Sequence, residues 1–217
     1  MTKEKRNYAK RDASEFNKFR AFWQVLVCGW IYGLYCKIVY KMEIHGLENV
    51  PEDNKYIVCP NHLTSLDPPL ICGVMPRRVS FMAKRELFDS SGFFIRWWMD
   101  WLGGFAVDRE KLAVSTMKTA MSLTKTDWVL GLFPQGTRGE FGVIKNVSKG
   151  FANLAKITKC GVLPVGIIVK PRQKNKPFSG KIIIKIGKII PYSDNIDEMV
   201  NQWGTAVAEL TGFKYEV

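Results

Sequence analysis

Short apolar runs of strand length alternate along this chain with longer segments of helical character. The expected strands are Lys41–His45 (exposed), Tyr56–Cys59, Arg78–Ala83, Trp128–Phe133, Val162–Val169 and Lys181–Ile186. The expected helices follow Pro68-Pro69 and span about residues 111–125, 149–159 and 194–210, the last with Ser193 or Asp194 as its N-cap. Strands that alternate with helices are typical of an α/β domain with a largely parallel sheet and helices on its faces. We predict that fold class for the body of the chain.

The N-terminal region differs in composition from the rest. Seven basic and three acidic residues fall within residues 1–20, and residues 21–36 carry no charge and are rich in Trp and Tyr. Basic residues beside an apolar, aromatic helix suit the interface of an anionic leaflet. The uncharged stretch is shorter than the roughly 20 residues of a spanning helix, although residues 38–40 bring it near that length. We therefore divide the chain into a basic tail with a helical, one-leaflet membrane anchor (residues 1–41) and an α/β domain (residues 42–217).

A second apolar segment, Phe93–Leu102, holds many aromatic residues. Two interpretations are equally good for it. One is a helix of the core, and the other is a second membrane-touching face beside the anchor.

The formal net charge of +12, from 32 basic and 20 acidic residues, indicates an anionic partner. Nucleic acid fits poorly, because the basic residues are dispersed and no recognition signature occurs. The lipids of an anionic membrane leaflet fit the basic tail and the aromatic helix better. The five cysteines are odd in number and form no C-x-x-C pair, which predicts a reducing compartment and no metal site.

Histidine is the first candidate for a base that works near neutral pH, and the chain has only His45 and His62. His62 lies in the predicted strand-to-helix loop, five residues before Asp67 at the mouth of the helix. From there Asp67 can accept the imidazole N–H, fix its tautomer and stabilise the imidazolium. Taken alone, this spacing favours a simpler interpretation, in which Asp67 caps the helix and His62 is a polar loop residue. We interpret His45 as structural.

Four segments in order carry more information than this pair. They are Asn61–Asp67, Gly103–Arg109, Phe133–Arg138 and Val162–Gly166. Together they resemble the four signature blocks of the glycerolipid acyltransferase family, the PlsC-like 1-acylglycerol-3-phosphate acyltransferases, from about residue 42 to about residue 187. One position departs from the family, whose third block usually reads Phe-Pro-Glu-Gly-Thr-Arg, because this chain has Gln135 in place of the acid. Gln135 can position a group by hydrogen bonding, but it cannot act as an acid or base.

The resemblance implies an acyl transfer in which His62 takes the proton of the acceptor hydroxyl and Asp67 orients the ring. Such assistance is typically worth ~10²–10⁴-fold in rate. A thioester would donate the acyl group as a co-substrate, either acyl-carrier protein (acyl-ACP) or coenzyme A (acyl-CoA), and no bound cofactor is expected. No G-x-S-x-G sequence occurs, which argues against a serine-acyl intermediate.

The acceptor phosphate needs cations, and the resemblance favours Arg138, then Arg109, then Lys84. The planar fork of arginine suits two phosphate oxygens at once. Arg138 also follows a turn in which Gly136 would let the backbone approach a ligand and leave N–H groups free to face an anion. The alternative for all three cations is a solvated surface charge.

Other residues of the blocks would support the site. They are Asn61, Gln135, Gly136, Thr137 and Pro164. The block around Pro164 would line the slot for the acyl chain, and packing in the core is an equally good interpretation.

These inferences predict a membrane-associated O-acyltransferase at the cytoplasmic face of the cell membrane. It would transfer a fatty acyl group to the free hydroxyl of lysophosphatidate and give phosphatidate in phospholipid synthesis. Another lysophospholipid or a lyso-aminolipid is the alternative acceptor, to which Gln135 would be a pointer. A non-catalytic, basic membrane-binding protein is the alternative from another class.

Overall fold

The computed structural model describes residues 11–90, 92–107, 114–170 and 180–216. Within these residues the main sheet has seven strands in the order β1-β8-β7-β2-β5-β3-β4, and neighbours are parallel except for β7 and β8. The strands are β1 (Glu43–His45), β2 (Tyr56–Pro60), β3 (Arg78–Lys84), β4 (Phe105–Val107), β5 (Trp128–Gly131), β7 (Gly161–Lys170) and β8 (Lys181–Ile186). β6 (Val143–Ile144) and β9 (Lys214–Tyr215) form another, parallel pair. The predicted α/β class with a largely parallel sheet is confirmed.

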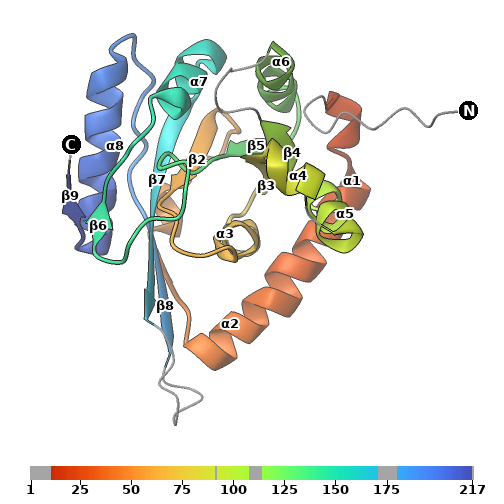
Figure 1. Ribbon diagram of the computed structural model, residues 1–217, viewed down its shortest axis with the longest axis horizontal. Coiled ribbons are helices and arrows are strands. Elements are labelled where there is room, and N and C mark those ends of the chain that lie inside the picture. Colours follow the sequence, from red (N-terminus) through yellow and green to blue (C-terminus); the bar gives the residue numbers. More distant parts are fainter. Residues whose placement is uncertain (1–10, 91, 108–113, 171–179, 217) are drawn as a thin grey trace, which may run out of the picture.

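Helices cover both faces of the sheet (Figure 1). They are α1 (Lys18–Gln24), α2 (Gly33–Tyr40), α3 (Asp67–Val74), α4 (Arg85–Ser90), α5 (Phe93–Trp101), α6 (Val114–Leu123), α7 (Gly150–Thr158) and α8 (Ile196–Thr211). A π-helical segment, η2 (Val25–Tyr32), joins α1 to α2, and 3₁₀ turns lie at η1 (Ala13–Glu15) and η3 (Leu47–Asn49). Helices α6, α7 and α8 pack on one face of the sheet, and α3 with η2 and α2 packs on the other.

Strand β2 shows how the sequence builds the two cores. Its side chains alternate, so that Ile57 and Cys59 face α6 to α8 while Tyr56 and Val58 face α3 and η2. All four are almost completely buried, as expected of a strand covered on both faces. Trp203 of α8 closes the first core and donates its Nε1–H to the carbonyl oxygen of Cys59 over 2.8 Å.

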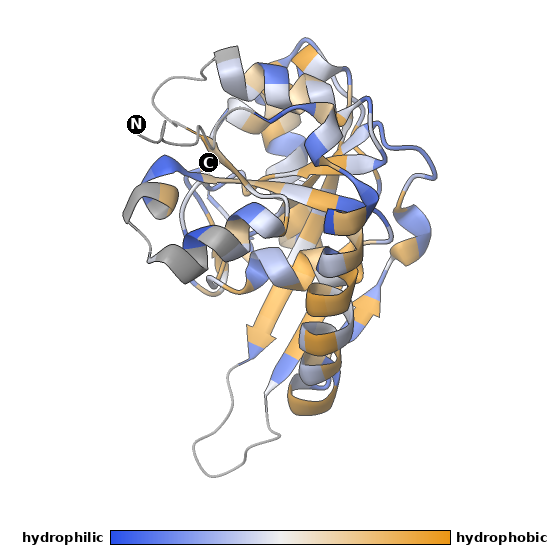
Figure 2. Cartoon of the chain, turned by 90° about the vertical axis from the view of Figure 1, so that its right-hand side faces the viewer, coloured by the Kyte–Doolittle hydropathy of each residue, from blue (hydrophilic) through white to orange (hydrophobic). Residues whose placement is uncertain are grey.

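One helix runs from Lys18 to Tyr40 through α1, η2 and α2, and it is long and apolar enough, by length and composition, to cross a membrane. One side of this N-terminal helix packs on α3, where Cys28 and Cys36 are fully buried. A Cβ atom on Gly73 of α3 would lie only 2.3 Å from the carbonyl oxygen of Cys28, so the two backbones touch. The other side is apolar and exposed (Figure 2). Its exposed side chains include Phe19, Phe22, Trp30, Ile31, Leu34, Tyr35 and Ile38.

The residues that precede this helix also pack on the body of the protein. Phe16 belongs to the core and lies 5.6 Å from the ring of Trp128, between centroids. Arg11 is buried and forms an ion pair of 2.6 Å with Asp100. The helix fits the expected anchoring segment, and the domain boundary at residue 41 stays a prediction.

The N-cap of α8 is Asn195, whose side chain accepts the N–H of Glu198 over 3.1 Å, so the prediction of Ser193 or Asp194 was wrong. The second apolar segment forms α5, and its Trp101 ring contacts Phe19 and Trp23 of α1 at centroid distances of 5.5 and 6.4 Å. Helix α5 therefore lies beside the anchor.

Candidate active site

The parallel strands β2, β5, β3 and β4 end at the same edge of the sheet, which is where ligands bind in open α/β sheets. The predicted site residues lie at this edge: His62 follows β2, Arg138 follows β5, and Lys84 ends β3. Val107 ends β4 directly opposite Lys84. Arg109, which comes shortly after it, lies outside the described residues.

His62 and Asp67 form a hydrogen-bonded pair. His62 Nδ1 lies 2.8 Å from Asp67 Oδ2. Asp67 is the first residue of α3 and its side chain is 1% exposed, whereas 16% of the His62 side chain is exposed. With the Nδ1–H donated to the carboxylate, Nε2 carries the lone pair that can take a proton.

Three more donors hold the Asp67 carboxylate. The backbone N–H groups of Leu63 and Thr64 donate to Oδ2 over 2.6 and 2.8 Å, and the Thr64 hydroxyl donates to Oδ1 over 2.7 Å. These donors precede α3, so Asp67 does not serve as a cap of that helix, and the simpler interpretation of the sequence fails. Both oxygens are fixed, and the carboxylate is rigid enough to orient an imidazole ring.

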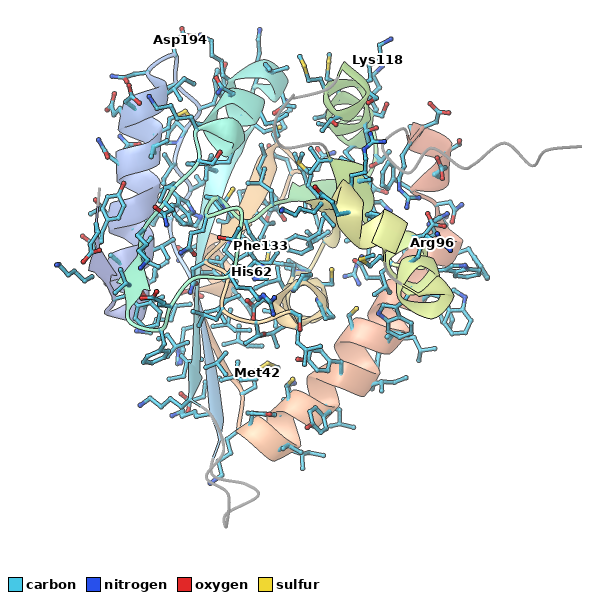
Figure 3. The ribbon with its side chains drawn as sticks, viewed as in Figure 1. Met42, His62, Arg96, Lys118, Phe133 and Asp194 are labelled. Atoms are coloured by element: carbon cyan, nitrogen blue, oxygen red, sulfur yellow. The ribbon has the colours of Figure 1, made fainter. Side chains whose placement is uncertain are left out.

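The imidazole ring of His62 lies against the phenyl ring of Phe133 (Figure 3). The two centroids are 4.0 Å apart at an interplanar angle of 20°, and Phe133 in turn stacks on Phe81 of β3 at 5.0 Å and 16°. The stack sets the plane of the histidine ring, while Asp67 sets its rotation. The ring therefore has one defined orientation.

The loop after β5 also holds the backbone of His62. Gln135 is buried and accepts the N–H of His62 at its Oε1 over 3.1 Å. Gly139 donates its N–H to the carbonyl oxygen of His62 over 2.7 Å. A Cβ atom on Gly139 would lie 2.6 Å from Gln135 Nε2, so Gln135 depends on a glycine at that position. This geometry gives Gln135 a positioning contact that needs no charge.

Asn61 fixes the start of the loop that carries His62. It is fully buried, and its side-chain amide makes two hydrogen bonds to the backbone of Ile167. Nδ2 donates to the carbonyl oxygen over 3.0 Å, and Oδ1 accepts the N–H over 2.6 Å. Its own N–H donates to the carbonyl oxygen of Val165 over 3.2 Å. Asn61 thus ties the segment after β2 to β7.

The fourth block lies in β7. Pro164 is buried opposite Cys59 of β2. Val162 belongs to the core under α6 to α8, and Leu163 and Val165 belong to the core under α3, all with no exposed surface. Of the two interpretations of this block, the structure shows packing in the core rather than the wall of an open slot.

Arg138 and Thr137 are exposed in the loop after β5. Arg138 stands next to Gly139, which contacts His62, so the backbone of Arg138 is close to the loop that carries the candidate base. Gly136 has a positive φ of 69° and donates its N–H to the carbonyl oxygen of Phe133 over 2.9 Å. That N–H closes the turn, and the expectation that other N–H groups of the turn face an anion stays a prediction.

Three residues of the site have roles that sequence reasoning missed. Thr64 stands three positions before Asp67, a spacing at which a hydroxyl and a carboxylate often meet at a helix start. Phe133 had the appearance of the last residue of a buried strand. No feature of the sequence around Gly139 indicates its role, because the contact that it allows joins Gln135 to His62, which is far away in the chain.

The N-terminal helix comes close to this site. Burial raises the pKa of Tyr32 of η2, and Cys36 and the carboxylate of Asp67 contribute further to the increase. Segment η2 packs on α3, whose first residue is Asp67. The apolar helix and the helix that carries Asp67 are therefore neighbours.

The cysteines offer no second reaction centre in the part of the chain that the structure describes. All five are buried free thiols, and burial raises the pKa of the Cys59 thiol well above its usual value, which makes it a poor nucleophile. No group of three or more His, Cys, Asp or Glu residues could hold a metal ion within the described ranges.

A histidine that is hydrogen-bonded to a buried aspartate at the carboxyl edge of a largely parallel sheet is an arrangement expected of an α/β enzyme with a candidate general base. The chain belongs to the acyltransferase family, whose model matches residues 41–168. The predicted family is confirmed.

Individual relatives agree with this assignment. The 1-acyl-sn-glycerol-3-phosphate acyltransferase of Bacillus subtilis is 30% identical over 149 residues, which cover 68% of this chain and 69% of that protein. The enzyme of the same name from Streptococcus pneumoniae is 35% identical over 153 residues, which cover 69% of this chain but only 56% of that protein. The crystal structure of PlsC, the 1-acyl-sn-glycerophosphate acyltransferase of Thermotoga maritima, matches with a TM-score of 0.68 and 25% identity over 88% of this chain and 78% of that one.

Proposed function

We propose that the protein transfers a fatty acyl group from a thioester to the free hydroxyl of lysophosphatidate, giving phosphatidate in phospholipid synthesis. The observation that carries the proposal is the 2.8 Å hydrogen bond between His62 Nδ1 and Asp67 Oδ2, which leaves Nε2 as the base. The names of the relatives, 1-acyl-sn-glycerol-3-phosphate acyltransferases, support this choice of acceptor.

His62 Nε2 accepts the proton of the acceptor hydroxyl while the oxygen attacks the thioester carbonyl. The ester C–O bond forms, the C–S bond breaks, and the thiolate leaves and takes up a proton. Asp67 stabilises the imidazolium in between, without itself becoming protonated. Orientation of the ring by Asp67 and Phe133 supports a direct transfer, because the base is held ready before the acceptor arrives.

The acceptor phosphate is bound by Arg138, with Arg109 and Lys84 as further cations. Arg138 is exposed beside the loop that contacts His62, and Lys84 lies at the same edge of the sheet. A planar guanidinium matches two phosphate oxygens. This arrangement would hold the glycerol backbone between the cations and the base.

The donor is acyl-ACP or acyl-CoA, and the protein works at the cytoplasmic face of the cell membrane. The exposed apolar side of the N-terminal helix supports insertion into one leaflet, since its opposite side is used for packing on α3. The buried free thiols support a reducing compartment.

The presence of Gln135 where the family usually has an acid raises a second candidate function, acylation of another lysophospholipid or of a lyso-aminolipid. The side chain is buried and already bonded to the His62 N–H, so it influences the acceptor through the base rather than by contact. Lysophosphatidate therefore remains the first candidate.

The test is a product assay of the purified protein with lysophosphatidate, other lysolipids and monoacylglycerol, each with acyl-ACP and with acyl-CoA. Phosphatidate should be the main product, and His62→Ala should remove it. Equal turnover of monoacylglycerol and lysophosphatidate would overturn the choice of acceptor.

A further inference from the structure

A groove of about 360 Å³ lies where the N-terminal helix crosses α3 and the start of β3. Its apolar lining consists of Val25, Gly29, Trp30, Leu34 and Gly73. Gly29 leaves space in it, because a Cβ atom there would meet nothing closer than 3.8 Å. Trp30 and Leu34 also belong to the exposed apolar side of the helix, with 69% and 55% of their surface exposed. The groove is therefore continuous with the surface proposed to enter the leaflet.

Two cations, Lys37 and Arg78, line the same groove. Arg78 is half-buried, and burial lowers the pKa of its guanidinium. One of its terminal nitrogens, Nη2, donates to the carbonyl oxygens of Pro76 and Met75 over 2.8 and 3.4 Å. Lys37 is exposed, and within the described residues neither cation forms an ion pair with a carboxylate. The groove thus combines an apolar lining with two positive charges that lack a counter-ion in the described part of the chain.

The groove is separate from the candidate active site. Arg78 begins β3 and Lys84 ends it, so about 20 Å of strand separates the groove from the carboxyl edge of the sheet. Along the N-terminal helix the lining runs from Val25 to Lys37, which corresponds to about 18 Å of helix. A ligand of that length would lie along the helix.

We infer that this groove binds one anionic phospholipid of the bilayer, with an acyl chain along the glycine-lined floor and the phosphate between Lys37 and Arg78. The apolar lining favours such a ligand over a free phosphate, because a phosphate has no apolar surface to bury there. The two unpaired cations distinguish it from a zwitterionic lipid, whose headgroup brings its own positive charge. This second lipid would hold the helix on the domain at an anionic membrane.

The experiment is a titration of the full-length protein in detergent solution, followed by the fluorescence of Trp30. The Trp30→Phe variant identifies the part of the signal that comes from this residue. The probes are short-chain phosphatidylglycerol, phosphatidylcholine with the same chains, and glycerol phosphate. Saturable binding is expected for phosphatidylglycerol, much weaker binding for phosphatidylcholine, and none for glycerol phosphate.

Four variants locate the site. Lys37→Gln and Arg78→Gln should each weaken phosphatidylglycerol binding about tenfold or more, as loss of a charge-assisted contact does. Gly29→Leu should block binding by filling the floor without a change in charge. Lys118→Gln is the matched control, because it removes the same charge from α6 on the other face of the sheet (Figure 3). Lys37 is exposed, so its variant tests the site even if Arg78→Gln does not fold.

Equal affinity for both lipids, unchanged affinity in Gly29→Leu, or an equal loss in Lys118→Gln would overturn the inference. The proposed function is judged separately. Gly29→Leu should keep its acyltransferase rate in detergent, and His62→Ala should keep its affinity for phosphatidylglycerol.

Discussion

Gly139 donates its backbone N–H to the carbonyl oxygen of His62 over 2.7 Å, and its lack of a side chain leaves the space that Gln135 uses to accept the N–H of the same histidine. The loop after β5 therefore holds both the backbone N–H and the backbone carbonyl oxygen of the candidate base. In this chain the third block contacts the candidate base through the backbone of His62. An amide oxygen at position 135 can accept that N–H, so the contact does not require a carboxylate.

Gly139→Ala should lower kcat while the protein stays folded. The new Cβ would come within 2.6 Å of Gln135 Nε2, the far end of a flexible side chain that can move away. That movement breaks the bond to His62, and a misplaced base costs up to ~10²-fold in rate. Steady-state kinetics would measure the loss, with Gly92→Ala as the control because a Cβ atom there meets nothing within 4 Å. Equal kinetics of the two variants would count against the positioning contact.

His62→Ala should abolish transfer, with a loss of at least ~10²–10⁴-fold in kcat. His45→Ala should keep most of the rate, because 59% of the His45 side chain is exposed on β1, and β8 and β7 lie between β1 and β2 in the sheet. The acylation assay measures both. Substantial transfer by the His62 variant would remove the base assignment.

Asp67→Asn should lower kcat far more than it raises the KM for the acceptor. An amide in place of the carboxylate no longer stabilises the imidazolium, and it can force the wrong tautomer on His62; the corresponding change in serine proteases costs ~10⁴-fold. Kinetics over a range of acceptor concentrations separate the two constants. A change mainly in KM would identify Asp67 as a binding residue instead.

Arg138→Lys should reduce kcat/KM for lysophosphatidate by roughly one to two powers of ten, since an ammonium lacks the planar fork and a charge-assisted hydrogen bond is worth about 1.5–3 kcal/mol. The penalty should vanish with monoacylglycerol, which has no phosphate. Arg109→Lys, assayed in parallel, shows whether a second arginine also binds the acceptor phosphate. An equal penalty on both acceptors would mean that Arg138 supports the fold or the donor.

Polar substitutions on the exposed side of the N-terminal helix should release the protein from vesicles without unfolding it. Phe22, Ile31 and Ile38 are 59%, 63% and 59% exposed, so Phe22→Ser, Ile31→Asn and Ile38→Asn remove no core contact. Flotation with anionic vesicles measures the effect, and Ile157→Asn on α7 is the control. High salt should weaken binding of the wild type only in part, because apolar insertion survives screening.

Deletion of the whole segment would be a poorer test of the anchor. Residues 1–40 include the buried side chains of Arg11, Phe16, Cys28 and Cys36. Their removal exposes both cores, so loss of membrane binding could not be separated from loss of the fold.

The local sequence contains most of the elements of this fold. Buried strands such as β2 appear as continuous apolar runs, and the proline pair at the start of α3 marks the helix that carries Asp67. The short list of histidines singles out His62. These signals lie within a few residues of each other, which is why the pair of His62 and Asp67 could be predicted from the sequence.

The rest of the site depends on strand order, which no local pattern records. Because β5 lies next to β2 in the sheet, Phe133 and Gln135 meet a histidine about seventy positions earlier in the chain. The cap of α8 was missed for a different reason. Ser193, Asp194 and Asn195 are all good capping residues, and only the path of the backbone into the helix selects Asn195.

Helix α3 is eight residues long, so its ends are about 12 Å apart. Its first residue, Asp67, orients the base, and its seventh, Gly73, touches the backbone of the N-terminal helix. A short helix within the protein therefore links the residue that orients His62 to the N-terminal helix. If that helix enters the leaflet as proposed, this fixed spacing sets the level at which an acceptor hydroxyl can reach His62.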